Sequence, residues 1–257
     1  MNSRINLFGV EIDRVRMSDA VERVMDWVAE SKSGCRYVVT PNVDHTVMLQ
    51  ENETFRDAYS EADLVTADGH PVVLASRLLG QALPERVTGA DLVPGLFDAA
   101  DESRPLRVFL LGAGPGVADR AARNIHGKWS GVQVVGTYSP PMGFENDEQE
   151  NDKILDRIAE ASPDILVVGL GAPKQELWVH EHRDRMQAKV ALCVGATIDF
   201  LANHKPRAPR WMQRVGLEWF HRMVSEPRRL VKRYARDAWI FPQLVWRQWW
   251  ARPARIA

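Results

Sequence analysis

Asp68 is the residue of this 257-residue chain whose position best suits acid–base chemistry. It follows the strand-like run Ala62–Ala67 and precedes Gly69, so its carboxylate should point into a cleft from the end of a strand. Partial burial there would raise the pKa of the carboxyl group toward the range of a general base. A structural alternative is equally open, because Asp68 could cap a helix that begins near Pro71.

Polar side chains follow two other apolar runs in the same way. Thr40 and Asn42 flank Pro41, where they could orient a substrate hydroxyl or only shape the turn. Asp199 follows Gly195 and could hold a ribose hydroxyl or cap a helix.

The loop Gly169–Trp178 has the features of an anion-binding site. Three small residues are followed by Pro173, the expected first residue of a helix, and then by Lys174 and Gln175. Backbone N–H groups at a helix start, together with a lysine, suit an anion such as a diphosphate. Structural turns explain the glycines equally well.

The segment Gly112–Gly116 resembles a dinucleotide fingerprint between a strand and a helix. Its spacing is G-x-G-x-G rather than the full G-x-G-x-x-G, and Thr137 and Tyr138 stand where an acidic residue is expected. A tight turn is therefore the favoured interpretation, with an NAD-binding α/β protein as the alternative.

Metal and disulfide chemistry have little support in the sequence. The chain has no C-x-x-C, no H-E-x-x-H and no D-x-D motif. Cys35 and Cys193 lie in apolar runs and are expected to be buried, reduced thiols. We predict no metal and no cofactor, so arginines or helix ends would have to neutralise a departing diphosphate.

Short apolar runs alternate with stretches of helix length through most of the chain, which predicts an α/β fold. We expect a small N-terminal hairpin about Gly9, a helix capped by Ser18, and then a mostly parallel, Rossmann-like sheet with helices on both faces. Ligands bind beyond the carboxyl ends of such strands, where the polar loops above would meet. The predicted strands are Tyr37–Thr40, Leu64–Ala67, Val108–Leu111, Val132–Thr137, Ile165–Gly169 and Val190–Val194.

The last quarter of the chain differs in composition from the rest. Residues 204–257 contain 13 Lys/Arg against three Asp/Glu, a net +10 that leaves −11 for the remainder of a chain totalling −1. Six of the nine tryptophans also lie there. We predict a catalytic α/β domain over residues 1–203 and a basic, tryptophan-rich helical appendage over residues 204–257. Its spacing predicts one amphipathic helix from Trp211 to Met223 and a second opening at Pro227.

The appendage is predicted to contact an anionic membrane surface. Arg222, Arg229, Arg233 and Arg236 would share one face if the two helices are nearly continuous. Basic residues beside tryptophans are typical of an interfacial element, although a solvated charged face is the structural alternative. The acidic body argues against nucleic acid. Because no signal peptide and no apolar run of about 20 residues is visible, we expect a cytoplasmic protein peripherally associated with the inner face of the cell membrane.

Several motifs, in a fixed order along the chain, resemble those of the WecG/TagA/CpsF glycosyltransferase family. They are TPN-x-D at Thr40–Asp44, ADG-x-P at Ala67–Pro71, ERVTGADL at Glu85–Leu92, GLGAPKQE-x-W at Gly169–Trp178, and VGATIDF followed by RAPRW-x-Q-x-x-GLEW-x-x-R-x-x-x-EP-R-R at Val194–Arg229.

The resemblance implies an inverting glycosyltransferase of cell-surface polysaccharide or teichoic-acid-type biosynthesis. The donor would be a UDP-sugar, with a hexose or an N-acetylmannosamine-like residue, and the acceptor a polyprenyl-diphosphate-linked sugar. By position, the resemblance implies that Asp68 is the catalytic base, with Thr40 beside it. The implied substrate-binding residues are Asn42, Arg86, Gln175, Asp199 near the nucleotide, and Arg222 and Arg229 of an appendage that helps to close the site. A basic nucleic-acid-binding module remains the third possibility.

Overall fold

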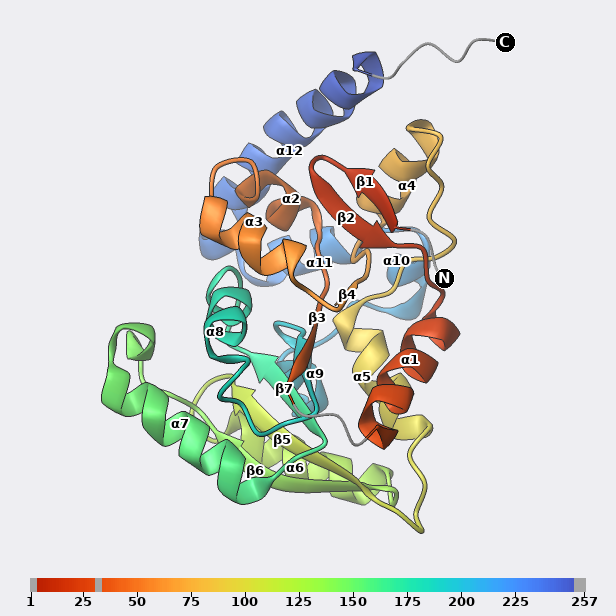
Figure 1. The fold of residues 1–257 in the computed structure, drawn as a ribbon. Coiled ribbons are helices and arrows are strands. Elements are labelled where there is room, and N and C mark those ends of the chain that lie inside the picture. The colour runs from red at the N-terminus through yellow and green to blue at the C-terminus, as the bar shows by residue number, and fades with distance from the viewer. Residues whose placement is uncertain (1–3, 31–33, 252–257) are drawn as a thin grey trace.

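The computed structural model describes residues 4–30 and 34–251, with the side chain of Arg229 left out. Its centre is a six-stranded sheet in the order β4-β3-β8-β7-β5-β6, in which every neighbouring pair is parallel (Figure 1). The predicted α/β class and all six predicted strands are confirmed, although the strand predicted over Leu64–Ala67 ends at Val65. The strands are β3 (Arg36–Val39), β4 (Leu64–Val65), β5 (Leu106–Gly112), β6 (Val132–Tyr138), β7 (Ile165–Gly169) and β8 (Val190–Cys193).

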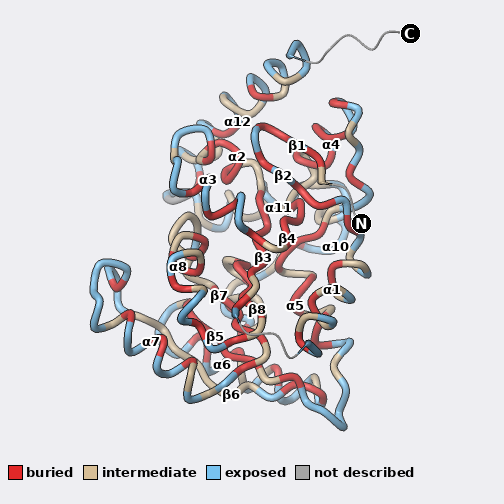
Figure 2. The backbone as a smooth tube through the Cα atoms, in the orientation of Figure 1, coloured by how far each residue is buried: buried red, intermediate tan, exposed pale blue. Residues whose placement is uncertain are grey.

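Both faces of the sheet are buried, because side chains of a strand alternate between them. In β7, Ile165 and Val167 join one core while Leu166 and Val168 join the other, and all four are fully buried. Figure 2 shows the inner strands β3, β8, β7 and β5 as almost continuously buried, whereas the edge strand β6 is mostly intermediate. Helices α1 (Met17–Ala29), α5 (Gly89–Asp98), α6 (Val117–Lys128) and α9 (Thr197–Leu201) cover one face, and α3 (Glu53–Ser60), α7 (Glu148–Ala161) and α8 (Lys174–His182) cover the other.

The predicted N-terminal hairpin is confirmed as β1 (Arg4–Leu7) and β2 (Val10–Asp13). It lies along the β4 edge, where the Val65 N–H donates to Asp13 Oδ2 at 2.9 Å. The Arg4 guanidinium donates to the Ala62 carbonyl at 2.9 Å. The hairpin therefore protects an edge that would otherwise expose unpaired backbone groups.

The predicted start of the first helix is wrong by two residues. Arg16 is the N-cap of α1, and its N–H donates to Asp19 Oδ2 at 2.9 Å, while Ser18 lies within the first turn. The Asp19 carboxylate, three residues after the cap, satisfies the Arg16 N–H, as in a capping box.

The appendage is broken into three helices, so the single helix predicted from Trp211 to Met223 is wrong, and the condition for a shared arginine face is not met. They are α10 (Arg210–Arg214), α11 (Glu218–Ser225) and α12 (Pro227–Trp250), the last opening at Pro227 as predicted. Gly216 separates the first two at φ 79°, and a Cβ there would lie 2.9 Å from His70 Cβ. Glu226 leaves helical geometry at φ −133°, ψ 58°. The arginines of α11 and α12 thus have no common helical face.

Helix α12 is docked on the body by one side. It packs on α2 (Val43–Met48), and Phe241 meets Phe8 of the hairpin turn edge-on at 5.3 Å. Gln248 accepts from the Phe8 N–H at 2.8 Å and donates to the Asn6 carbonyl at 2.7 Å. Figure 1 shows the far end of α12 extending past the hairpin. None of the helices in the described ranges is long and apolar enough to cross a membrane.

Candidate active site

Asp68 is held at the junction of three loops. Its N–H donates to the Pro41 carbonyl after β3 at 2.9 Å, and the Val87 N–H donates to the neighbouring Ala67 carbonyl at 2.9 Å. Helix α4 (His70–Leu78) begins after Gly69, which lies at φ 122° and supplies no side-chain cap. Asp68 therefore does not cap α4, and the structural alternative for this residue is excluded.

The surroundings of Asp68 suit a base that works near neutral pH. The residue is half-buried, so it is enclosed by protein yet reachable from solvent. Burial raises the pKa of its carboxyl group to about 7. This value already includes the negative charges of Glu218 and Asp91, which also raise the pKa, and the positive charges of Arg86 and Arg222, which lower it.

Thr40 and Asn42, the predicted site residues after β3, flank Pro41, whose carbonyl accepts from the Asp68 N–H. Thr40 is 5% exposed, and its hydroxyl donates to the Cys193 carbonyl at 3.4 Å. Asn42 is the N-cap of α2, with its side-chain oxygen accepting from the His45 N–H at 3.1 Å. The turn-shaping role of Asn42 is thus observed. Its amide nitrogen makes no hydrogen bond within the described residues.

Glycines let the loops after β5, β7 and β8 approach one another. A Cβ on Gly112 would lie 2.5 Å from the Gly169 carbonyl oxygen, and one on Gly169 would lie 2.9 Å from that of Gly195. Gly116 adopts a left-handed conformation, φ 72°, at the start of α6. Close packing at Gly112 and a turn at Gly116 therefore explain two of the three glycines of the incomplete dinucleotide fingerprint.

Gln175 links the loop after β7 to the loop after β8 by a hydrogen bond. It is 2% exposed, accepts from the Gly195 N–H at 3.1 Å and donates to Glu176 Oε1 at 2.8 Å. Direct contact of Gln175 with a substrate stays a prediction. Lys174, expected near an anion, forms an ion pair with Glu145 at 2.7 Å.

Sequence analysis missed the buried polar cluster behind this loop. Glu176 is fully buried, and burial raises the pKa of its carboxyl group to about 7. His45 Nδ1 lies 3.9 Å from Glu176 Oε1 and 2.6 Å from the Tyr59 hydroxyl, while burial lowers the pKa of His45 to about 3. His45 is therefore neutral near pH 7, while Glu176 changes its protonation state in that range. No spacing marks such a cluster, because the three residues come from separate helices.

The appendage meets the body next to Asp68. His70 Nε2 lies 2.9 Å from the Gln213 carbonyl oxygen of the appendage. Arg86, predicted to contact substrate, binds Glu218 Oε2 at 3.2 Å and lies 3.5 Å from Asp91 Oδ2. Arg207 binds the other oxygens of the same two carboxylates, Asp91 Oδ1 at 2.7 Å and Glu218 Oε1 at 3.4 Å. Four alternating charges thus form a closed ring, which we call the arginine–carboxylate ring.

Arg222 lies within electrostatic reach of both Asp68 and Asp44 and lowers the pKa of each. In the part of the chain that the structure describes, its guanidinium forms no hydrogen bond and no ion pair. The Arg229 side chain lies outside the described residues, so its role stays a prediction. Asp199 lies in the first turn of α9 and caps no helix, since Ala196 is the N-cap and provides no side-chain bond.

Two buried aspartates, Asp44 and Asp237, lie where α12 meets α2. Of the two, only Asp44 belongs to a motif noted in the sequence, TPN-x-D. Asp44 is 5% exposed, with Arg233 Nε 3.3 Å from its Oδ1. Asp237 is also 5% exposed, and neither of its oxygens has a hydrogen-bond partner among the described residues. Burial, with Asp44 nearby, raises the pKa of Asp237 to about 6.

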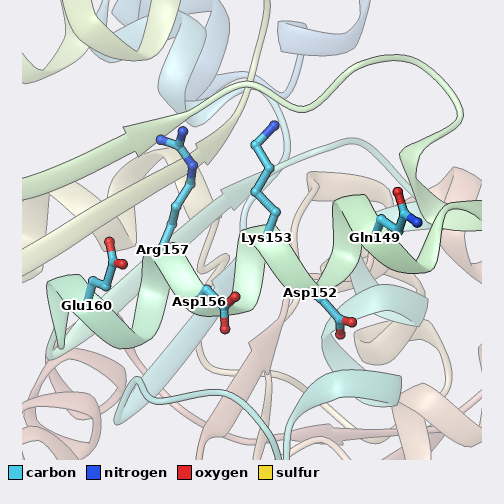
Figure 3. Close-up of a pocket in the computed structure, with 6 residues that line it drawn as sticks. All are labelled: Gln149, Asp152, Lys153, Asp156, Arg157 and Glu160. Atoms are coloured by element: carbon cyan, nitrogen blue, oxygen red, sulfur yellow. The ribbon is translucent and has the colours of Figure 1, made fainter.

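A polar depression runs along α7, at the opposite side of the sheet from Asp68. Lys153 and Arg157 extend from the helix toward β6 in Figure 3, where their charged ends lie 5.0 and 4.6 Å from the Tyr138 ring centre. Because β6 and β4 are the two edges of the sheet, this depression is remote from the Asp68 site. It is lined by Gln149, Asp152, Lys153, Asp156, Arg157 and Glu160.

Residues 5–255 match the sequence profile of the Glycosyl transferase WecG/TagA/CpsF family. The chain belongs to this family. The match includes the appendage as well as the body. Family membership confirms the resemblance seen in the motifs and favours a glycosyl transferase over an NAD-binding protein or a nucleic-acid module.

Curated relatives of the family share a quarter to a third of their residues with this chain. An N-acetylglucosaminyldiphosphoundecaprenol N-acetyl-beta-D-mannosaminyltransferase of Bacillus spizizenii is 33% identical over 193 residues, 75% of this chain and 72% of the relative. A protein of the same name from Staphylococcus aureus (strain MRSA252) is 27% identical over 228 residues, 89% of this chain and 87% of the relative.

Proposed function

We propose that this glycosyl transferase moves N-acetylmannosamine from a UDP-sugar to a polyprenyl-diphosphate-linked N-acetylglucosamine, with inversion at the anomeric carbon. The observation that carries the proposal is Asp68, a half-buried carboxylate with a pKa of about 7 at the end of a parallel strand. The names of the family relatives support the sugar and the lipid-linked acceptor.

In the proposed reaction, Asp68 takes the proton from the acceptor hydroxyl, with Thr40 beside it. The hydroxyl oxygen forms a bond to the anomeric carbon while the bond from that carbon to the UDP oxygen breaks. Because a single displacement occurs from the face opposite UDP, the configuration inverts. A carboxyl pKa of about 7 balances ionisation at neutral pH against basicity.

The leaving diphosphate gains negative charge, and we propose that Arg222 and Arg229 stabilise it together with backbone N–H groups of the Gly169–Glu176 loop. Donors aimed at developing charge are a large term in such reactions. Asn42, Arg86 and Asp199 would orient the substrates, and Gln175 would hold the loop in place or contact the substrate. We propose that no metal and no cofactor is needed, so EDTA should leave transfer unchanged.

Transfer of labelled sugar from a panel of UDP-sugars to a lipid-linked N-acetylglucosamine acceptor tests this function. We expect UDP-N-acetylmannosamine to be the best donor and the product to carry the inverted linkage. Transfer only from UDP-glucose or from the uronic acid would change the donor, while a retained linkage would exclude single displacement.

We further propose that residues 1–203 form the catalytic domain and residues 204–257 an appendage that holds the protein against the anionic inner face of the cell membrane, on the cytoplasmic side, without binding nucleic acid. One observation favours this. Trp239, Trp246 and Trp250, spaced by seven and four residues on α12, are 75%, 64% and 68% exposed. Their common side faces away from the body, as expected for an interfacial helix.

Replacing these three tryptophans by alanine should weaken binding to anionic vesicles about tenfold or more, because their burial at the interface is lost. Cosedimentation with phosphatidylglycerol-containing vesicles measures it. Met142→Ala, which removes a 96%-exposed apolar side chain from the body, is the control and should bind normally. Undiminished binding of the triple variant would exclude this side of α12 as the contact.

A further inference from the structure

In the arginine–carboxylate ring, each of the two carboxylates contacts both guanidinium groups. Asp91 and Glu218 each direct one oxygen to Arg86 and the other to Arg207. The ring lies close enough to Asp68 that three of its members rank among the charges acting on that carboxyl group. Two guanidinium groups bridged by two carboxylates beside the reacting centre describe an anion site that already contains anions.

The two carboxylates are not equivalent. Asp91 belongs to α5 of the body, also accepts from the Thr88 hydroxyl at 2.8 Å, and makes the shortest contact of the ring, 2.7 Å to Arg207. Glu218 is the first residue of α11, has the longer side chain, and lies 3.2 and 3.4 Å from its two partners. Glu218 is therefore the anion that is held less tightly.

One N–H donor group of the Arg207 guanidinium lacks a hydrogen-bond acceptor among the described residues. Its Nη2 is buried and has no hydrogen-bond partner within the described residues. The side chains of Arg86 and Arg207 are only 16% and 23% exposed, so water satisfies them poorly. A diphosphate carries more charge and more acceptor oxygens than one carboxylate, and planar guanidinium forks match its geometry.

We propose that Arg86 and Arg207 together bind a diphosphate group, and that Glu218 occupies this site as an internal anion which the diphosphate displaces. In this exchange the Glu218 side chain rotates away, while α10 keeps its contact with His70. The assignment of the diphosphate to a substrate rests on the proposed function. It comes either from the nucleotide or from the lipid carrier.

Calorimetric titration with inorganic pyrophosphate, UDP and geranyl diphosphate tests the site directly. Glu218→Gln should bind pyrophosphate roughly three- to tenfold more tightly than the wild type, because the competing internal charge is gone. Asp91→Asn should bind no more tightly, since it loosens Arg207. Arg207→Lys should bind about tenfold or more weakly, since it keeps the charge but loses the fork. If Glu218→Gln binds UDP more tightly than the wild type does, the diphosphate is that of the nucleotide. If it binds geranyl diphosphate more tightly, the diphosphate is that of the lipid carrier.

Glu226→Gln is the matched control. Glu226 lies in the same appendage and pairs with Lys205 at 3.0 Å, outside the ring, so its variant should bind pyrophosphate like the wild type. Weaker pyrophosphate binding by Glu218→Gln would mean that Glu218 only holds the appendage in place, and it would overturn the inference. Tighter binding by Asp91→Asn, equal to that of Glu218→Gln, would also overturn it. If sugar transfer proceeds while Glu218→Gln binds unchanged, the inference fails alone. If the wild type binds none of the three ligands, the proposed function fails with it.

Discussion

We expect Asp68→Asn to reduce sugar transfer by about 10²- to 10⁴-fold, the range that a general base contributes. The amide cannot accept the acceptor proton, although it fills the same space. The fold should not suffer, because Asp68 holds its loop through its backbone N–H, and a neutral amide avoids the cost of burying a charge. Initial-rate transfer assays beside a thermal melt measure both effects. Near-wild-type turnover of this variant would exclude Asp68 as the base.

The pH dependence of the wild type provides a second readout of the same group. Asp68 must be ionised to act, so kcat/KM should rise with pH through about 7 and lose this acidic limb in Asp68→Asn. The raised pKa also means that the folded protein binds a proton more readily than the unfolded chain, so the contribution of Asp68 to stability falls as pH rises toward 7. Asp156→Asn on α7, at the remote depression of Figure 3, should change neither rate nor profile.

We expect Arg222→Gln to lower kcat by about 10²- to 10³-fold, the loss that follows removal of one donor to developing charge. Donor KM should change less, because the charge on the leaving diphosphate grows in the transition state. Since Arg222 lowers the pKa of Asp68, its removal should also move the acidic limb of the rate profile to higher pH. Steady-state kinetics over a pH series measure all three quantities.

Arg214→Gln is the control for the loss of a positive charge from the appendage. Arg214 ends α10 and is exposed, so its variant should keep wild-type kcat and the same pH profile. A normal kcat in Arg222→Gln, or an acidic limb that stays in place, would remove Arg222 from the reaction.

Local sequence signals were sufficient for the strands and for Asp68. Runs such as Ile165–Gly169 are apolar on both faces, which only a covered parallel sheet accommodates. The same periodicity failed at the appendage, because Gly216 and Glu226 interrupt the helix where packing against His70 and α12 requires it. Ser18 failed as a cap because the helix begins at Met17, with Arg16 as the N-cap and its N–H bound by Asp19.

The amino-acid sequence alone was enough to establish the α/β class, the strand-end position of Asp68 and the family, because each depends on short-range periodicity or on motifs read in order. Only the tertiary structure determined the partners of the charged residues. Arg86 and Glu218 are 132 residues apart in the chain, and Arg207 and Ala90 are 117 residues apart, yet each pair is in contact. Ion pairs, burial and the resulting pKa of Asp68 depend on distances in space, which the folded chain sets and no local pattern encodes.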